Sequence, residues 1–284
     1  GTAPGMLFEH KDKYIISMPG VPLEMKNMFE KFVYNFLFNL IELRKENVLA
    51  FKILQTIGIP ESVLAEKIGN PDLFIQGGTL AFLPSYKGVK LRIGFSANDF
   101  KTANQLISEA ENYIRQKVGK YIFATEEVTI NQVIASLLIE KNKTIAVAES
   151  CTGGLLSANF TDIPGSSKYF FGGIVAYSND IKTKLVNVDE NTIKRFGAVS
   201  KETVESLALN VRKIFNSDFG IGITGIAGPS GGTKQKPVGT VWIALANKNS
   251  VYSNKFFLGD DRIIIRERAV TTAFNMLYKS LIDN

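Results

Sequence analysis

The sequence predicts an α/β protein, with a three-layer α/β domain at its C-terminal end and a smaller α+β module before it. Short β-branched runs alternate with helical periodicity from about residue 125 onward, which is typical of layered α/β folds. The runs are apolar along their length, as expected for strands buried on both faces of a sheet. The 284 residues exceed one average domain, and 45% hydrophobic with 21% charged residues is ordinary globular composition.

Residues 1–45 are expected to be the remnant of an N-terminal domain. A short strand at 14–18 precedes a helix that opens at Pro22 and carries apolar residues at helical spacing. One strand and one helix cannot enclose a core. The chain also starts without Met, and without the basic flank and apolar core of a signal peptide, so we expect a fragment or a processed product.

Residues 46–124 predict the small α+β module. A strand over 48–55 precedes a helix opened by Pro60, two strands flank a turn at 85–88, and a helix follows over 100–118. Its residues form no chemical cluster, which favours a spacer or dimerisation module.

Residues 125–284 predict the α/β domain. A helix at 131–141 leads to a strand beginning at Thr144, and a helix follows from about Thr152. Further strands are expected at 173–177, 219–225, 240–246 and 250–259, with a long C-terminal helix. Ser200 is placed to cap the helix that runs to Ile214.

Charge and cysteine content narrow the functional classes. The net charge of +6, from 33 Lys and Arg against 27 Asp and Glu, is spread along the chain, which argues against a nucleic-acid partner and suits an anionic small substrate. The single cysteine excludes an intrachain disulfide and agrees with a cytoplasmic location. No His/Cys cluster predicts a metal, and no apolar run predicts a membrane span.

The first candidate site is the stretch Glu149-Ser-Cys-Thr-Gly-Gly154, where a strand passes into a helix. Gly153 and Gly154 allow close backbone approach, and first-turn N–H groups can hold an anion or an oxyanion. The alternative is a tight turn with a Ser or Thr cap.

The second candidate is the glycine-rich loop that follows the strand ending at Thr224 and Gly225 and that includes Gly228. It resembles a phosphate or oxyanion cradle. It contains no GxxxxGK[ST], and a strand rather than a helix follows it, so it is neither a P-loop nor a dinucleotide fingerprint. A plain connecting loop is the alternative.

The third candidate is the stretch from Tyr177, at a strand end, to Lys182, early in a helix. A serine nucleophile without histidine needs another base, and a desolvated lysine can serve, with a tyrosine as relay. The alternative is that Lys182 is an ordinary surface lysine. Cys151 is a rival nucleophile, although such a cysteine is more often a small buried residue.

Arg262 and Arg266 lie four residues apart near the start of the last helix, so we expect them on one face. Arginine suits a phosphate or carboxylate ligand, and surface pairing with acidic residues is the alternative.

Five motifs, AESCTGG, the segment with YSN and Lys182, GAVS, TGIAGP with KPVGTVW, and GD followed by two arginines, occur in the order typical of one family. From about residue 130 the chain resembles the C-terminal domain of the CinA (competence/damage-inducible protein) family. The stretch IGIPESVLAEKI resembles the family's KH-like middle module, and GTAPGM with MPGVPLEMK resembles the end of its molybdopterin-binding-like domain. The GxxG clamp of RNA-binding KH domains is absent from residues 46–124.

The resemblance implies nicotinamide mononucleotide (NMN) amidohydrolase activity, a hydrolysis of a linear amide in pyridine nucleotide salvage, with no metal or other cofactor. It implies Ser150, Tyr177 and Lys182 as catalytic residues. It implies Thr224, Gly225 and Gly228 as positions of a substrate loop, and Arg262 and Arg266 as candidate phosphate contacts. Thr152, Gly153 and Gly154 are expected to bind substrate because they form the turn with free N–H groups described above. Asp261 is an extra residue before Arg262 relative to the family's GDR pattern, so the choice of phosphate-binding arginine stays open.

In the mechanism that follows, Ser150 attacks the carboxamide carbon, Lys182 acts as base directly or through Tyr177, and N–H groups near Gly153 or Gly225 hold the oxyanion. Ser150 positioning a water, without an acyl-enzyme, is the alternative. A non-catalytic nucleotide-binding or competence-associated interaction protein is the rival function. A homodimer is expected.

Overall fold

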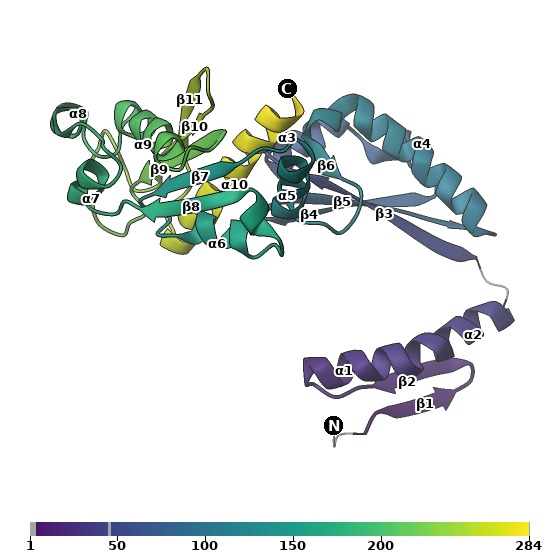
Figure 1. The fold of residues 1–284 in the computed structure, drawn as a ribbon. Helices are drawn as coiled ribbons and strands as arrows, with labels where there is room; N and C mark the ends of the chain where they lie inside the picture. Colours follow the sequence, from purple (N-terminus) through teal and green to yellow (C-terminus); the bar gives the residue numbers. More distant parts are fainter. Residues whose placement is uncertain (1–3, 45–46, 284) are drawn as a thin grey trace. The chain divides into compact units, whose positions relative to one another are not determined.

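The computed structural model describes residues 4–44 and 47–283 (Figure 1). At the N-terminal end, β1 (Met6–His10) and β2 (Lys13–Ser17) form an antiparallel hairpin, of which only β2 was expected. A helical segment follows as α1 (Pro22–Met28), the π-helical turn Phe29–Val33 and α2 (Tyr34–Arg44), with Pro22 as its predicted first residue.

The next segment builds a four-stranded sheet in the order β4-β5-β3-β6. Its strands are β3 (Val48–Thr56), β4 (Gly78–Ser85), β5 (Gly88–Ala97) and β6 (Ile122–Ala124). Its helices are α3 (Glu61–Ile68) and α4 (Phe100–Val118), with 3₁₀ turns at Pro71–Leu73 and Gly119–Tyr121. The succession β-α-β-β-α-β with this order is the split βαβ arrangement, and it agrees with the predicted α+β module.

The rest of the chain forms a five-stranded mixed sheet in the order β11-β10-β9-β7-β8. Its strands are β7 (Ile145–Glu149), β8 (Phe170–Val175), β9 (Phe219–Gly225), β10 (Thr240–Ala246) and β11 (Val251–Phe257). β7 runs parallel to both β8 and β9, whereas β10 runs antiparallel to β9 and to β11. The helices are α5 (Ile130–Glu140), α6 (Leu155–Thr161), a 3₁₀ turn at Ser166–Lys168, α7 (Asn179–Lys184), α8 (Glu190–Phe196), α9 (Lys201–Ile214) and α10 (Arg262–Ile282).

Helices cover both faces of this sheet, which confirms the predicted three-layer α/β fold (Figure 1). Successive side chains of a strand point to opposite faces. Ile145 and Val147 therefore pack in one core with residues of α5, α6 and α10, while Ala146 and Ala148 pack in a second core with residues of α9. All five residues of β7 are buried, which explains its continuous apolar sequence.

Glycines in β9 let α9 approach the sheet closely. A Cβ atom at Gly220 would lie 2.2 Å from the carbonyl oxygen of Ala208, and one at Gly222 would lie 2.6 Å from that of Val204. Ser200 caps α9 as predicted, because its side chain accepts a hydrogen bond from the Thr203 amide. The alternating glycines of this strand thus serve helix packing rather than ligand binding.

The strand directions decide where the functional candidates lie. Because β7, β8 and β9 are parallel, their carboxyl ends meet at one edge of the sheet, and the three candidate segments all follow these ends. The tight β10–β11 turn at 247–250 lies at the opposite edge, since β10 runs antiparallel to β9. Within the described residues, no helix combines the length and apolar character needed to cross a bilayer.

Two expected elements differ from the structure. The helix predicted from Thr152 begins at Leu155, because residues 151–154 form a turn in which Gly153 and Gly154 have positive φ angles of 61° and 91°. The strand predicted at 173–177 is β8, which ends at Val175 and leaves Tyr177 beyond the sheet. α8 was not among the expected elements.

Candidate active site

A pocket of about 310 Å³ opens at the carboxyl edge of the sheet. The three parallel strands each contribute the segment that follows them, and α10 contributes its first residue. The lining residues are Ser150, Cys151, Tyr177, Asn179, Lys182, Ala198, Val199, Thr224, Gly225, Ile226, Ala227, Gly228, Ser230, Gly231 and Arg262. The structure therefore brings together seven residues expected at the site, from positions 150 to 262 of the chain.

Ser150 and Lys182 form the polar centre of this pocket. The Nζ atom of Lys182 lies 3.1 Å from the Oγ atom of Ser150, and the two residues are 1% and 8% exposed. The Ser150 amide is fixed by a hydrogen bond to the Ile223 carbonyl on β9. Ser178 caps α7 by accepting from the Ile181 amide, and this cap sets the helix that carries Lys182.

The surroundings of Lys182 favour its neutral form. Its Nζ donates to the carbonyl oxygens of Ala176 at 2.8 Å and Tyr177 at 3.1 Å, and no ion pair involving this ammonium is found among the described residues. Burial lowers the pKa of Lys182 below its ordinary 10.5, while nearby Cys151 acts in the opposite direction. In the neutral amine, two N–H bonds remain on the carbonyl groups, and the lone pair is left to accept the Ser150 hydroxyl proton.

Cys151 follows Ser150 and also lines the pocket, but its sulfur is unsuited to nucleophilic attack. The side chain is 6% exposed. Burial, and secondarily the charge of Glu149, raises the pKa of the Cys151 thiol to about 12. Because the thiolate is the reactive form, the structure favours Ser150 over Cys151 as the nucleophile.

Glu149 holds the turn that carries Ser150. Its carboxylate is fully buried and accepts hydrogen bonds from the amides of Gly154, Leu156 and Ser157 and from the Ser157 hydroxyl, at 2.6 to 3.1 Å. Four donors therefore compensate one buried negative charge. The carboxylate occupies the first-turn amides of α6, so these amides are not available to an anionic ligand.

Tyr177 contributes its backbone to Lys182 and its side chain to Arg262. The phenol is 59% exposed, and its oxygen accepts a hydrogen bond from Nη2 of Arg262 at 3.3 Å. Nη1 of the same arginine donates to the Gly228 carbonyl at 2.7 Å. No proton relay through the phenol is required, because the lysine and the serine are in direct contact.

The glycine-rich loop forms one wall of the pocket and is fastened to a second segment. Thr224 is 1% exposed, and its hydroxyl donates to the Ala198 carbonyl at 2.8 Å. Further along the loop, Nζ of Lys236 donates to the carbonyl oxygens of Phe196 at 3.0 Å and Val199 at 2.7 Å. These bonds fix both walls of the pocket against each other.

Four of the expected binding residues are not in the pocket lining. Gly153 and Gly154 donate their amides within the turn, to Ser150 and Glu149, and Thr152 is fully buried. Arg266 supports the turn from outside, because its Nε and Nη2 donate to the Thr152 carbonyl at 3.2 and 2.8 Å. Of the two arginines, Arg262 is therefore the one that lines the pocket.

Sequence reasoning missed several contributors to this site. Asn179, Ala198, Val199 and Ser230 line the pocket, and Glu149 and Lys236 hold its walls. The extra residue Asp261 caps α10 by accepting from the Ile264 amide, so it has a structural role. Across the described ranges 4–44 and 47–283, no three His, Cys, Asp or Glu side chains gather as metal ligands would.

The fold and the pocket place this chain in a class of proteins with a three-layer α/β domain and a buried serine–lysine pair at the carboxyl edge of the sheet. Family models then match two parts of the chain, the CinA C-terminal domain at residues 127–281 and the damage-inducible protein CinA KH domain at residues 51–124. The chain belongs to the CinA family of competence/damage-inducible proteins, and the resemblance seen in its motifs is confirmed.

Individual relatives agree with this assignment. A CinA-like protein of Thermosipho melanesiensis is 42% identical over 284 residues, which cover 99% of this chain and 67% of the relative. A CinA-like protein of Fervidobacterium nodosum is 40% identical over 285 residues, with the same coverage of 99% and 67%.

Solved structures match about half of the chain. The competence/damage inducible protein CihA from Agrobacterium tumefaciens is 35% identical, with a TM-score of 0.51, and the match covers 56% of this chain and 99% of that structure. A CinA superfamily protein from Klebsiella pneumoniae is 28% identical, with a TM-score of 0.53, over 55% of this chain and 97% of that structure.

Proposed function

We propose that this chain is an NMN amidohydrolase, which converts NMN and water into nicotinate mononucleotide and ammonia in pyridine nucleotide salvage. The observation that carries the proposal is the direct contact of Lys182 Nζ with Ser150 Oγ in a pocket, at 3.1 Å, with a lysine pKa lowered by burial. A neutral lysine beside a serine hydroxyl is a nucleophile–base pair suited to amide hydrolysis without histidine.

The reaction proceeds in two steps, acylation of Ser150 with release of ammonia and hydrolysis of the resulting ester. In the first, Lys182 takes the Ser150 proton while Oγ attacks the carboxamide carbon, and the resulting ammonium returns a proton as the C–N bond breaks and ammonia leaves. In the second, the same lysine takes a proton from water, the water oxygen attacks the ester, and the proton returns to Oγ. Ser150 orienting a water for direct attack is the alternative route to the same products.

The remaining pocket groups divide the other tasks. Since the amides of Gly153 and Gly154 are used inside the turn, we assign oxyanion binding to the Cys151 amide, which follows the nucleophile, and to the loop from Gly225. Arg262 supplies the charge for the 5′-phosphate. Tyr177 holds Lys182 through its carbonyl and orients Arg262 through its hydroxyl.

The test is ammonia release from NMN by the purified chain, with nicotinate mononucleotide quantified by chromatography. Ser150→Ala and Lys182→Met should each lower turnover by at least about a hundredfold. Lys184→Met is the matched control, because Lys184 lies on the same helix, is exposed and pairs with Asp180. Full turnover in both site variants would refute the assignment.

A second measurement separates the two routes and the rival function. Mass spectrometry of rapidly quenched enzyme should show a mass increase on the peptide carrying Ser150 if the acyl-enzyme forms. NMN that raises the melting temperature without any ammonia release would instead support the non-catalytic nucleotide-binding function. Nicotinamide and nicotinamide riboside should both be poorer substrates than NMN, because neither carries the phosphate that Arg262 would bind.

A further inference from the structure

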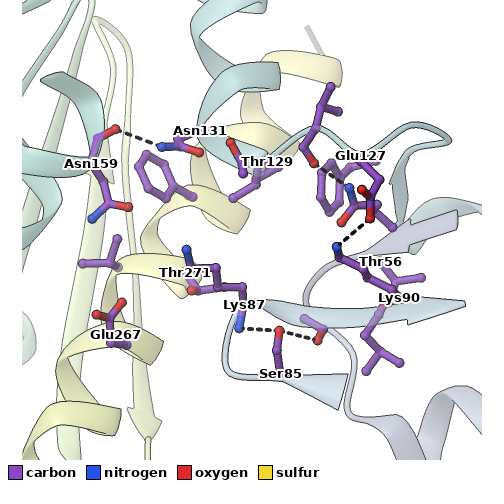
Figure 2. Close-up of a pocket in the computed structure, with 18 residues that line it drawn as sticks. Thr56, Ser85, Lys87, Lys90, Glu127, Thr129, Asn131, Asn159, Glu267 and Thr271 are labelled. Atoms are coloured by element: carbon purple, nitrogen blue, oxygen red, sulfur yellow. Dashed lines mark hydrogen bonds and ion pairs between the residues drawn. The ribbon is translucent and has the colours of Figure 1, made fainter. Parts of the chain in front are cut away.

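A second cavity of about 310 Å³ lies away from the candidate active site, and the proposed reaction does not use it. Figure 2 shows Ser85 and Lys87 from the β4–β5 turn, Thr129 and Asn131 from the start of α5, and Glu267 and Thr271 from α10 around this cavity. We define it as the α10 cavity.

The α10 cavity has an apolar floor. Phe274 and Val270 of α10 are 2% and 3% exposed, and Phe123 and Val128 add further apolar surface. Residues 267, 270, 271 and 274 share one helical face, so α10 presents a charged, an apolar and a hydroxyl group to the same space. The floor thus suits a ligand with an apolar body.

Four charged side chains line the cavity, and two of them neutralise each other. Lys90 and Glu127 form an ion pair at 3.4 Å. For Lys87 and Glu267, no ion pair is found in the part of the chain that the structure describes; the Lys87 ammonium lies 5.8 Å from the Tyr86 ring centroid. One positive and one negative group therefore remain for a ligand.

Two amides add acceptors to the negative side. Nδ2 of Asn131 donates to the Asn159 carbonyl at 3.1 Å, and Nδ2 of Asn159 donates to the Leu155 carbonyl at 2.9 Å. Each nitrogen uses one of its two N–H groups in this way. Among the described residues no hydrogen bond to either side-chain oxygen is found, so both oxygen atoms are available as acceptors for a cationic group.

We propose that the α10 cavity binds a small zwitterion with an apolar body, of the α-amino acid class, with its carboxylate on Lys87 and its ammonium near Glu267 and the two asparagine oxygens. A ligand with a single charge satisfies only one of the two uncommitted groups and meets the other as a like charge. The zwitterion complements both, and its side chain covers the apolar floor.

The cavity shares two helices with the candidate active site. Asn159 lies on α6, whose first turn is bound by the Glu149 carboxylate, and Glu267 follows Arg266, which holds the Thr152 carbonyl. A ligand here contacts both helices that hold the Ser150 turn. A change in NMN turnover on ligand binding is therefore expected, and this one consequence rests on the proposed function.

Calorimetry and thermal denaturation test the binding without reference to turnover. The probes are L-phenylalanine and L-leucine, compared with N-acetyl-L-phenylalanine, which lacks the positive charge, and L-phenylalaninamide, which lacks the negative one. The amino acids should bind once per chain, raise the melting temperature by about 5 °C at saturation, and bind about tenfold more tightly than either derivative.

Variants assign the two charges. Lys87→Ala should remove the preference for phenylalanine over its amide, and Glu267→Gln should remove the preference over the N-acetyl form. Thr271→Trp should fill the cavity and abolish binding, whereas Lys279→Trp, at an exposed position on the same helix, should not. Melting curves without ligand establish that each variant is folded.

The proposal is overturned if no amino acid binds, if the derivatives bind as well as the zwitterions, or if Lys87→Ala and Glu267→Gln leave both preferences unchanged. Failure of the proposed amidohydrolase activity would leave these binding results intact, because neither calorimetry nor thermal denaturation with the amino acids uses NMN.

Discussion

Replacing Glu149 by glutamine should loosen the turn that carries Ser150, although the two side chains have almost the same shape. The carboxylate accepts two hydrogen bonds on each oxygen: Gly154 and Leu156 amides on Oε2, and the Ser157 amide and hydroxyl on Oε1. Glutamine offers one oxygen and one NH₂ group. In its best orientation the NH₂ group faces Ser157, whose hydroxyl can rotate to accept, so one buried amide loses its acceptor.

The size of the effect follows from that count. A buried donor left without a partner costs about 1–3 kcal/mol. For a domain of roughly 150–250 residues, a loss of 1 kcal/mol in the free energy of unfolding lowers the melting temperature by about 2–4 °C. Glu149→Gln should therefore lower the melting temperature by roughly 2 to 12 °C. Glu149→Ala should lower it further, because all four donors lose their acceptor and a void remains.

Thermal denaturation followed by circular dichroism measures this change, with Glu140→Gln at the exposed end of α5 as the control. The control variant should have the same melting temperature as the unmodified protein. If Glu149→Gln also melts at the unmodified temperature, the carboxylate does not hold the turn, and its assigned role is refuted.

Three further predictions concern the chemistry. Burial lowers the pKa of Lys182, so the neutral amine appears at a lower pH than for an ordinary lysine; kcat/KM for NMN should therefore rise with pH through a pKa below 10.5, and a flat or falling profile would contradict lysine as the base. Cys151→Ala should keep kcat within about threefold of the unmodified value, because a thiol with a pKa of about 12 is not the nucleophile; loss of turnover in a folded variant would reverse that conclusion. Arg262→Gln should raise KM for NMN about tenfold while leaving KM for nicotinamide riboside almost unchanged. Arg266→Gln frees the Thr152 carbonyl and should therefore impair turnover of both substrates. If both variants impair NMN alone and to the same extent, Arg262 does not make a specific phosphate contact.

The fold was largely predictable because its strands carry strong local signals. The predicted bounds of β9 and β10 are the same as those in the structure. The predicted start of β7, Thr144, lies one residue before the observed start, Ile145. β1 was missed because it is exposed along its whole length and lacks a core-facing pattern. α6 begins three residues later than expected, because the hydroxyl-rich turn before it adopts a backbone conformation that two glycines permit.

The candidate site was predictable in its residues but not in all of its geometry. The convergence of Ser150 and Lys182 follows from two parallel strands ending at one edge of the sheet, which strand order alone can indicate. Helical spacing predicts that Arg262 and Arg266 share one face of α10. The structure directs them to different partners, because Arg262 reaches the Gly228 carbonyl and Arg266 reaches the Thr152 carbonyl, and this depends on how α10 packs beside the turn. Lys236 binds carbonyl groups 37 and 40 residues away, a contact for which the local sequence gives no sign.

The β10–β11 turn at residues 247–250 lies at the sheet edge remote from the pocket, and it is closed by its own hydrogen bonds to the Asn247 side chain. Lys248, at its exposed tip, is consequently a suitable point for a fluorophore or for surface immobilisation. A label there would follow ligand association in real time while leaving the residues around Ser150 chemically untouched.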